Sequence, residues 1–116
     1  MTTGDCVFCR IVRKEIPGAV RLETDDLLAF DSIDPKAPIH ILVIPKHHIE
    51  HLGSAVDADQ VLLGKLLLAC RDLAKQLALP GFKIVINNGP ASGQSVPHLH
   101  IHLLGGQISP SALQSL

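Results

Sequence analysis

The chain has 116 residues, 47% hydrophobic and 18% charged, which suits one folded domain and is not typical of a disordered segment. The formal net charge is −1 with histidine neutral, and the absence of a basic run argues against a general nucleic-acid binder. No stretch of roughly 18 apolar residues and no secretory signal pattern is present. With three cysteines, an odd number, the sequence predicts a cytoplasmic protein without a membrane partner.

The N-terminal half predicts one short helix followed by three strands. Residues 6–15 carry apolar side chains at helical spacing, and the Pro-Gly pair at 17–18 ends this helix. Residues 19–23 and 27–32 are strand candidates whose short polar connection favours a hairpin. After a proline-containing loop, residues 40–44 form a further strand that is closed by a proline.

The C-terminal half predicts a long helix and two more strands. Asp57 is expected to cap the helix, with Gln60 placed to answer it, and the helix runs to about Leu77. Its apolar residues cover more than one stripe, so the surplus is expected to pack on a second subunit. Residues 82–86 form a strand, 87–96 a polar Gly-rich loop, and a final strand follows. This order predicts an α+β fold, an antiparallel sheet with helices on one side.

The final strand candidate reads His98-Leu99-His100-Ile101-His102. Successive side chains of a strand point to opposite faces, so Leu99 and Ile101 are expected in the core and the three histidines on the other face. Same-face neighbours lie about 6–7 Å apart, so a phosphate or a metal ion can touch two of them. A polar solvent face is the simpler explanation, but histidine is uncommon in that role and suited to chemistry near pH 7.

The loop before this strand, from Asn87 to Ser95, is rich in glycine, which lets backbone N–H groups turn toward an anion. Alone it would be an ordinary surface turn, but beside three histidines it favours phosphate binding. A neutral imidazole is nucleophilic at pH 7, so attack on phosphorus would give a phosphohistidine. A second, protonated imidazole would pair with the phosphate, and Ser95 would pass a proton to the leaving group.

Four segments in this order make the chain similar to the histidine triad (HIT) family, and within it to the Hint branch of nucleotide-binding hydrolases. The segments are residues 5–11 (DCVFCRI), 13–17 (RKEIP), 37–49 (APIHILVIPKHHI) and 93–102 (GQSVPHLHIH). The resemblance covers about residues 5–106 of one domain spanning 1–116, with a short variable tail at 107–116. It implies a five-stranded antiparallel sheet with two helices, and a homodimer whose two sheets join into a continuous ten-stranded sheet.

The resemblance implies hydrolysis of purine nucleoside phosphoramidates, in which AMP or GMP is joined to an amine. In that pattern His100 is the nucleophile, His102 contacts the phosphate, and His40 supports it from the adjacent strand. With Ser95 these are the predicted catalytic residues. The predicted nucleotide-binding residues are Phe8, Ile11, Phe30, Ser32, Ile33, Asn87, Gly93, Gln94, Ser95, His100 and His102.

Two departures from the family pattern bear on specificity. The family usually has an acidic residue eight positions before His40, where it binds the ribose hydroxyls, but this chain has Ser32 there, flanked by Asp31. A serine hydrogen-bonds less strongly than a carboxylate, so either nucleoside binding is weaker or Asp31 substitutes. The Hint C-terminus usually continues with a Trp-Pro segment that reaches the partner's active site, and this chain has no tryptophan.

Cys6 and Cys9 form a Cys-x-x-Cys pair at the start of the first helix, where a redox pair, a metal pair and simple packing residues all stay open. No βαβ unit typical of a redox pair is visible. Two thiolates and two imidazoles make a tetrahedral set that suits zinc. Because zinc-containing family members use the positions of His48 and His98, the resemblance implies a structural zinc site formed by these four residues.

Other assignments stay open beside these. His47 and His51 are expected at the surface, and Cys70 in the core. Dinucleoside polyphosphates or nucleotide sugars are alternative substrates, because the same superfamily chemistry applies and only the leaving group changes. A zinc-stabilised, nucleotide-binding scaffold dimer with little turnover is a further alternative; the intact triad argues against it, whereas Ser32 and the altered C-terminus leave it open.

Overall fold

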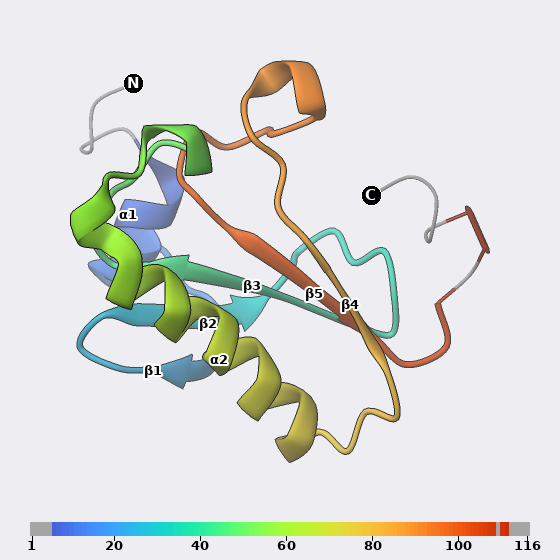
Figure 1. The fold of residues 1–116 in the computed structure, drawn as a ribbon. Helices are drawn as coiled ribbons and strands as arrows, with labels where there is room; N and C mark the ends of the chain where they lie inside the picture. Colours follow the sequence, from blue (N-terminus) through green and yellow to red (C-terminus); the bar gives the residue numbers. More distant parts are fainter. Residues whose placement is uncertain (1–5, 109, 112–116) are drawn as a thin grey trace.

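The computed structural model describes residues 6–108 and 110–111, so Asp5 and most of the predicted tail at 107–116 lie outside the described residues. The helices and strands follow one another in the predicted order (Figure 1). They are α1 (Val7–Val12), β1 (Val20–Glu23), β2 (Leu27–Asp31), β3 (Ile39–Pro45), α2 (Gln60–Gln76), β4 (Phe82–Val85) and β5 (Ile101–Gly105).

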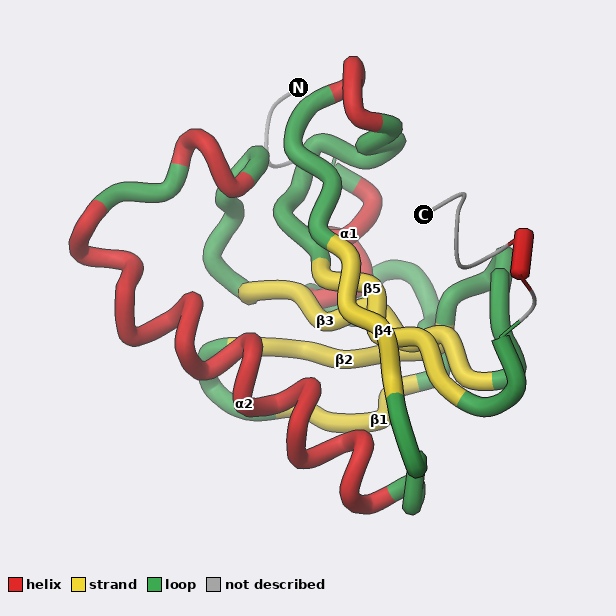
Figure 2. The backbone as a smooth tube through the Cα atoms, turned by 45° about the vertical axis from the view of Figure 1, so that its right-hand side comes forward, coloured by secondary structure: helices red, strands yellow, loops and turns green. Residues whose placement is uncertain are grey.

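The strands form a single antiparallel sheet in the order β1-β2-β3-β5-β4 (Figure 2). The first three strands are neighbours in sequence, whereas β5 inserts between β3 and β4. In the β3–β5 register Leu42 lies opposite His102 and His40 lies opposite Leu104, so the two histidines are diagonal neighbours on one face. The predicted α+β fold, with a five-stranded antiparallel sheet and two helices, is confirmed.

The two helices cover opposite faces of the sheet, and the expectation that both lie on one side is wrong (Figure 1). Alternate residues of β2 and β3 enter two separate cores, because the uninterrupted apolar runs of these strands leave no solvent face. The core under α2 contains Leu27, Ala29, Ile41, Val43, Leu66, Cys70 and Leu73. The core under α1 contains Phe8, Ile11, Leu28, Phe30, Leu42 and Ile44.

The helix boundaries differ from the expected ones for local reasons. Residues 57–59 form a 3₁₀ turn, and the N-cap of α2 is Asp59, so the predicted cap at Asp57 is wrong. The Asp59 carboxylate accepts a hydrogen bond from the backbone N–H of Val56 at 2.9 Å and so closes the preceding turn. Helix α1 ends at Val12, shorter than expected, and Lys14 then adopts a left-handed φ of 65°.

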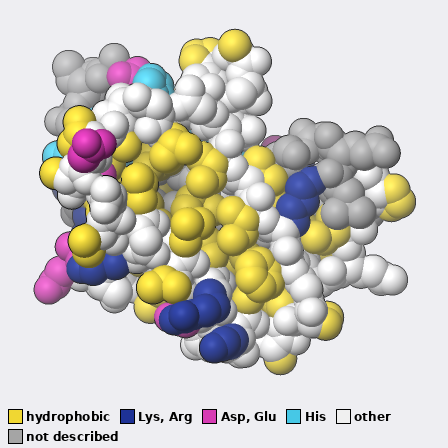
Figure 3. All heavy atoms as spheres, in the orientation of Figure 1, with side chains coloured by type: hydrophobic (Ala, Val, Ile, Leu, Met, Phe, Trp, Pro, Cys, Tyr) yellow, Lys and Arg dark blue, Asp and Glu magenta, His cyan; other side chains and the backbone are white. Residues whose placement is uncertain are grey.

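Helix α2 buries one face and leaves another apolar face open. Cys70 is fully buried in the core beneath the helix, as predicted. On the opposite side Val61 and Leu68, seven residues apart on one stripe, are 70% and 49% exposed. Figure 3 shows hydrophobic side chains gathered on this face of the molecule. None of the helices in the described part of the chain combines the length and hydropathy needed to cross a bilayer.

Candidate active site and metal centre

The histidine segment is extended, but it joins the sheet only at Ile101, later than predicted. The last β3–β5 pair is Val43 with Ile101; before it, the N–H of Leu99 bonds to the carbonyl of Ile49, outside the sheet. The expected alternation still holds. Leu99 and Ile101 enter the core under α2, whereas His98 and His100 face the ring of Phe8 on α1.

His100 is buried, and its protonation is set by the backbone. Its Nδ1 lies 2.7 Å from the carbonyl oxygen of His98, and since a carbonyl only accepts, Nδ1 carries the proton and donates it. Nε2 is then the basic nitrogen of the ring. Burial lowers the pKa of His100, which keeps the ring neutral near pH 7. A neutral imidazole with an unprotonated nitrogen is the form that attacks phosphorus.

His40 and His102 form a hydrogen-bonded pair whose direction follows from the chain. The backbone N–H of Lys36 donates to Nδ1 of His40 at 2.9 Å, so the proton of the neutral His40 ring sits on Nε2. That Nε2 donates to Nδ1 of His102, also at 2.9 Å, which leaves the His102 proton on its own Nε2.

Both rings of this pair are neutral in the free protein. Burial lowers the pKa of His40 and lowers that of His102 to about 4. In place of the expected imidazolium, the free protein therefore offers a neutral N–H donor at His102. Because His102 also lies against His100, with ring centroids 5.0 Å apart, this donor sits beside the candidate nucleophile.

A cavity of about 620 Å³ opens beside these histidines, within the range of small-molecule binding sites. Its walls are formed by helix α1, the segment after β2, the Gly-rich loop, and the histidines on β3, on β5 and just before β5. All of the predicted catalytic residues line it, and so do all of the predicted nucleotide-binding residues except Gln94. They are Phe8, Ile11, Phe30, Ser32, Ile33, His40, Asn87, Gly93, Ser95, His100 and His102.

Gln94 is buried and holds the Gly-rich loop in place. Its amide nitrogen donates to the carbonyls of Glu50 and Val96 at 2.8 and 2.9 Å, and its amide oxygen accepts the N–H of Gly89 at 2.7 Å. Gly89 and Gly93 have φ values of 81° and 99°, which L side chains rarely adopt, so the loop requires glycine at both positions. The side chain of Gln94 thus positions the residues that line the cavity.

Two charged residues from the proline-containing loop before β3, where the sequence predicts no functional residue, also line the cavity. They are Asp34 and Lys36, and the Lys36 ammonium donates to the Asp34 carboxylate at 2.7 Å. The available signal was two opposite charges on either side of a proline, just before the strand that carries His40.

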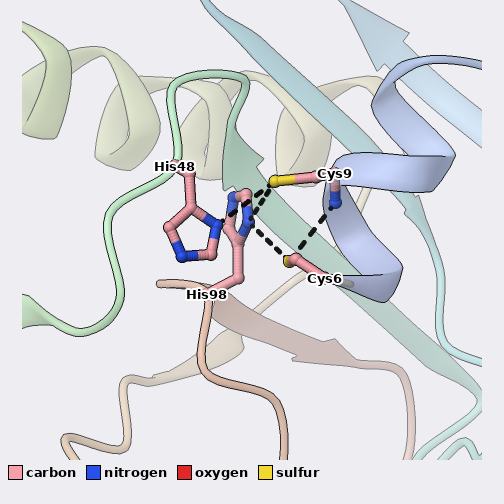
Figure 4. Close-up of side chains that lie close together, drawn as sticks. All are labelled: Cys6, Cys9, His48 and His98. Atoms are coloured by element: carbon pink, nitrogen blue, oxygen red, sulfur yellow. Dashed lines mark hydrogen bonds between the residues drawn. The ribbon is translucent and has the colours of Figure 1, made fainter. Parts of the chain in front are cut away.

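Cys6, Cys9, His48 and His98, the predicted metal ligands, lie together (Figure 4). Their ligand atoms all lie within 4.8 Å of one another. Nδ1 of His98 is 3.2 Å from Sγ of Cys6 and 3.5 Å from Sγ of Cys9, and Nδ1 of His48 is 3.2 Å from Sγ of Cys9. The four residues come from the start of α1, the segment after β3 and the segment before β5, so a bound ion would join three parts of the chain.

The hydrogen bonds around His98 fit metal ligation. Its Nε2 lies 2.9 Å from the carbonyl oxygen of Pro45 and must donate, which turns the Nδ1 lone pair toward the two sulfurs. Metal-ligating histidines typically donate their other N–H in this way. Burial lowers the pKa of His98 to about 4 and raises that of Cys9 to about 11, and a cation would offset the cost of the buried thiolate. Neither His47, which is exposed, nor the half-buried His51 belongs to the cluster.

Comparison with known proteins identifies the family. Residues 13–108 match the family model described as the HIT domain. The chain belongs to the histidine triad (HIT) family. It is 52% identical over 104 residues to a HIT-like protein of Synechococcus elongatus, which covers 89% of this chain and 91% of that relative.

Solved structures of HIT proteins share the fold. A HIT family hydrolase from Legionella pneumophila is 42% identical with a TM-score of 0.86, covering 89% of this chain and 94% of the other. A histidine triad protein from Clostridium difficile is 38% identical with a TM-score of 0.89, covering 95% and 97%. At this coarse level the HIT chain has the fold of a hydrolase.

Lowering the pH from 7.5 to 5 is expected to reduce the free energy of unfolding. Folding depresses the pKa of His102 to about 4 from its usual 6.5, so in this window the unfolded chain binds more protons than the folded one. The stabilisation is complete above about pH 6.5 and is lost as the pH falls toward 4. Urea unfolding at both pH values should show a weaker pH dependence in His102→Asn and an unaltered one in the exposed control His47→Asn. An unaltered dependence in His102→Asn would contradict this interpretation.

Proposed function

We propose that this HIT protein hydrolyses purine nucleoside phosphoramidates, with Nε2 of His100 as the nucleophile. The observation that supports this most is the bond from Nδ1 of His100 to the carbonyl of His98, which makes Nε2 the basic nitrogen of a ring that lines the cavity. The resemblance to the Hint branch supplies the substrate class. AMP, GMP and adenosine phosphoramidates are the proposed ligands.

The cavity offers separate surroundings for the parts of a nucleotide. Phe8, Ile11 and Phe30 are buried apolar side chains on its wall, and Ile33 is fully exposed beside them. These residues are proposed to hold the purine by apolar contact. Asn87, Gly93 and Ser95 come from the loop whose shape Gln94 maintains, and they are proposed to hold the phosphate.

The reaction is proposed to run in two balanced steps. Nε2 of His100 forms a bond to phosphorus as the P–N bond to the amine breaks, and the amine leaves with a proton that the Ser95 hydroxyl relays from solvent. Water then attacks phosphorus, the bond to His100 breaks with its electron pair returning to Nε2, and the proton lost from water returns to solvent. The N–H on Nε2 of His102 is proposed to donate to a phosphate oxygen, and His40 holds that ring through the 2.9 Å bond.

The metal is proposed to be zinc, bound by Cys6, Cys9, His48 and His98. Two thiolates and two imidazoles are a common tetrahedral zinc set, and all four ligand atoms are close enough to share one ion. When bound, zinc would supply cross-links that hold α1 against the histidine segment and take no part in the reaction. Reduced thiols, which this ligation needs, suit the cytoplasmic location predicted from the sequence.

A second copy of the chain is proposed to cover the open face of α2. Val61 and Leu68 are exposed there, and Phe82 is 44% exposed on β4, an edge strand of the sheet among the described residues. Pairing of two β4 edges would give the continuous sheet that the resemblance implies. Size-exclusion chromatography with light scattering is expected to give twice the 12.4 kDa mass of one chain, and the chain mass for Leu68→Glu. A wild-type protein with the mass of one chain would contradict the dimer.

His100→Ala is expected to reduce the turnover of an adenosine phosphoramidate by at least about a thousandfold, because it removes the nucleophile. His47→Ala, at an exposed histidine, should keep wild-type turnover. The rate is measured as the release of AMP, which is quantified by chromatography. Circular dichroism checks that both variants are folded. Retained turnover in His100→Ala would end the proposal. If the wild type cleaves diadenosine polyphosphates faster than the adenosine phosphoramidate, the alternative substrates are favoured. If it binds AMP tightly but turns over no phosphoramidate, the scaffold alternative is favoured.

Protein purified without a chelator is expected to contain about one zinc ion per chain, because four ligands converge on one point. Cys9→Ser should lower the zinc content severalfold, whereas Cys70→Ala, which removes a buried thiol outside the cluster, should keep it. Elemental analysis gives the content, and the absorption of the cobalt-loaded protein reports thiolate ligation. Clearly substoichiometric zinc in the wild type would contradict the assignment.

A further inference from the structure

The acidic residues that line the cavity come from one short segment at the end of β2. Among the described residues they are Asp31 and Asp34, and Ser32 lies between them. A ribose presents two neighbouring hydroxyl groups, both of which can donate hydrogen bonds. An ionised carboxylate accepts such bonds about twice as strongly as a neutral group does.

The side chain of Asp31 pairs with Arg21 and starts on the other face of the sheet. Asp31 pairs with Ile41 across the β2–β3 ladder, and Ile41 belongs to the core under α2, so the side chain of Asp31 starts on that face. The candidate catalytic histidines lie on the opposite face. The Asp31 carboxylate also accepts a hydrogen bond from Nε of Arg21 at 2.9 Å. A substitution of Asp31 for the missing family acid would require it to leave this ion pair and change faces.

Asp34 and Ser32 lie in the turn that follows the strand. The N–H of Ser32 bonds to the carbonyl of His40 at 2.9 Å, which fixes the turn beside the histidine pair. The N–H of Asp34 donates to Oγ of Ser32 at 3.2 Å, so the serine hydroxyl keeps its own proton for donation.

The carboxylate of Asp34 is ionised and partly open. Oδ2 accepts from Lys36, and this bond holds the pKa of Asp34 below its usual range. The side chain is 80% exposed, and no donor among the described residues bonds to Oδ1. One carboxylate oxygen is thus available at the cavity wall.

We propose that Asp34, together with the hydroxyl of Ser32, binds the 2′,3′-diol of the nucleotide ribose. The carboxylate that the family places at position 32 is then supplied from two residues further along the chain, by the turn that brings Asp34 back to Ser32. This inference rests on the proposed function, since it concerns the sugar of that substrate.

The test compares an adenosine 5′-phosphoramidate with its 2′-deoxy counterpart. Wild-type protein is expected to favour the ribonucleotide by about tenfold in kcat/KM, and Asp34→Asn should bring the two values to within about twofold. Asp31→Asn removes the other carboxylate and is the matched control, which should keep the tenfold preference. Ser32→Ala should lower the preference partially, and Ser32→Asp should restore it in the Asp34→Asn background.

Titration of AMP and 2′-deoxy-AMP into the His100→Ala variant, with and without Asp34→Asn, separates sugar binding from turnover. If the wild type hydrolyses neither phosphoramidate, the proposed function fails, while these titrations still decide the role of Asp34. A ribose preference that survives Asp34→Asn, or that is lost in Asp31→Asn instead, would overturn the inference. A wild-type protein with no preference between the two sugars would overturn it as well.

Discussion

Hydrogen bonds to the backbone determine which ring nitrogen of each buried histidine carries the proton, and the proposed chemistry of the site depends on these tautomers. The carbonyl of Pro45 accepts a hydrogen bond from the Nε2–H of His98, and the carbonyl of His98 accepts one from the Nδ1–H of His100. The backbone N–H of Lys36 donates a hydrogen bond to Nδ1 of His40, so the proton of the neutral His40 ring lies on Nε2, which faces the neighbouring strand. Neighbouring rings of one residue type therefore differ: His98 turns its Nδ1 toward the sulfurs, and His100 has an unprotonated Nε2, the nitrogen that we propose attacks phosphorus.

The metal cluster and the cavity share structural supports. Helix α1 has only six residues, too few to persist alone, and it carries Cys6 and Cys9 at its start and Phe8 on the cavity wall. His98 belongs to the cluster, and its carbonyl orients His100. A metal ion in the cluster would therefore fix one wall of the cavity and the residue that orients His100, the proposed nucleophile.

Sequence patterns predicted the features that depend on local periodicity, and they missed the strand boundary that depends on the register of the sheet. The order of elements and the alternation along residues 98–102 followed from spacing alone. The late start of β5 did not, because it depends on where the ladder with β3 ends. The helix starts two residues later than predicted because residues 57–59 form a local 3₁₀ turn, which the capping pattern does not distinguish from the start of an α-helix. The structural role of Gln94 depends on its bond to the carbonyl of Glu50, a tertiary contact that no single segment reveals. Asp34 lies at the cavity because the turn that contains it is closed by the hydrogen bond from its N–H to Oγ of Ser32. The hydropathy pattern gives no signal for such a turn.

The most direct measurement is the protonation of the His100 ring, read from long-range ¹H–¹⁵N correlation spectra of uniformly labelled protein at pH 7.5. A neutral ring with its proton on Nδ1 and an unprotonated Nε2 is the result that the hydrogen bond to His98 predicts. A proton on Nε2, or a charged ring, would mean that the nitrogen assigned to attack phosphorus has no lone pair to use, and the account would be contradicted.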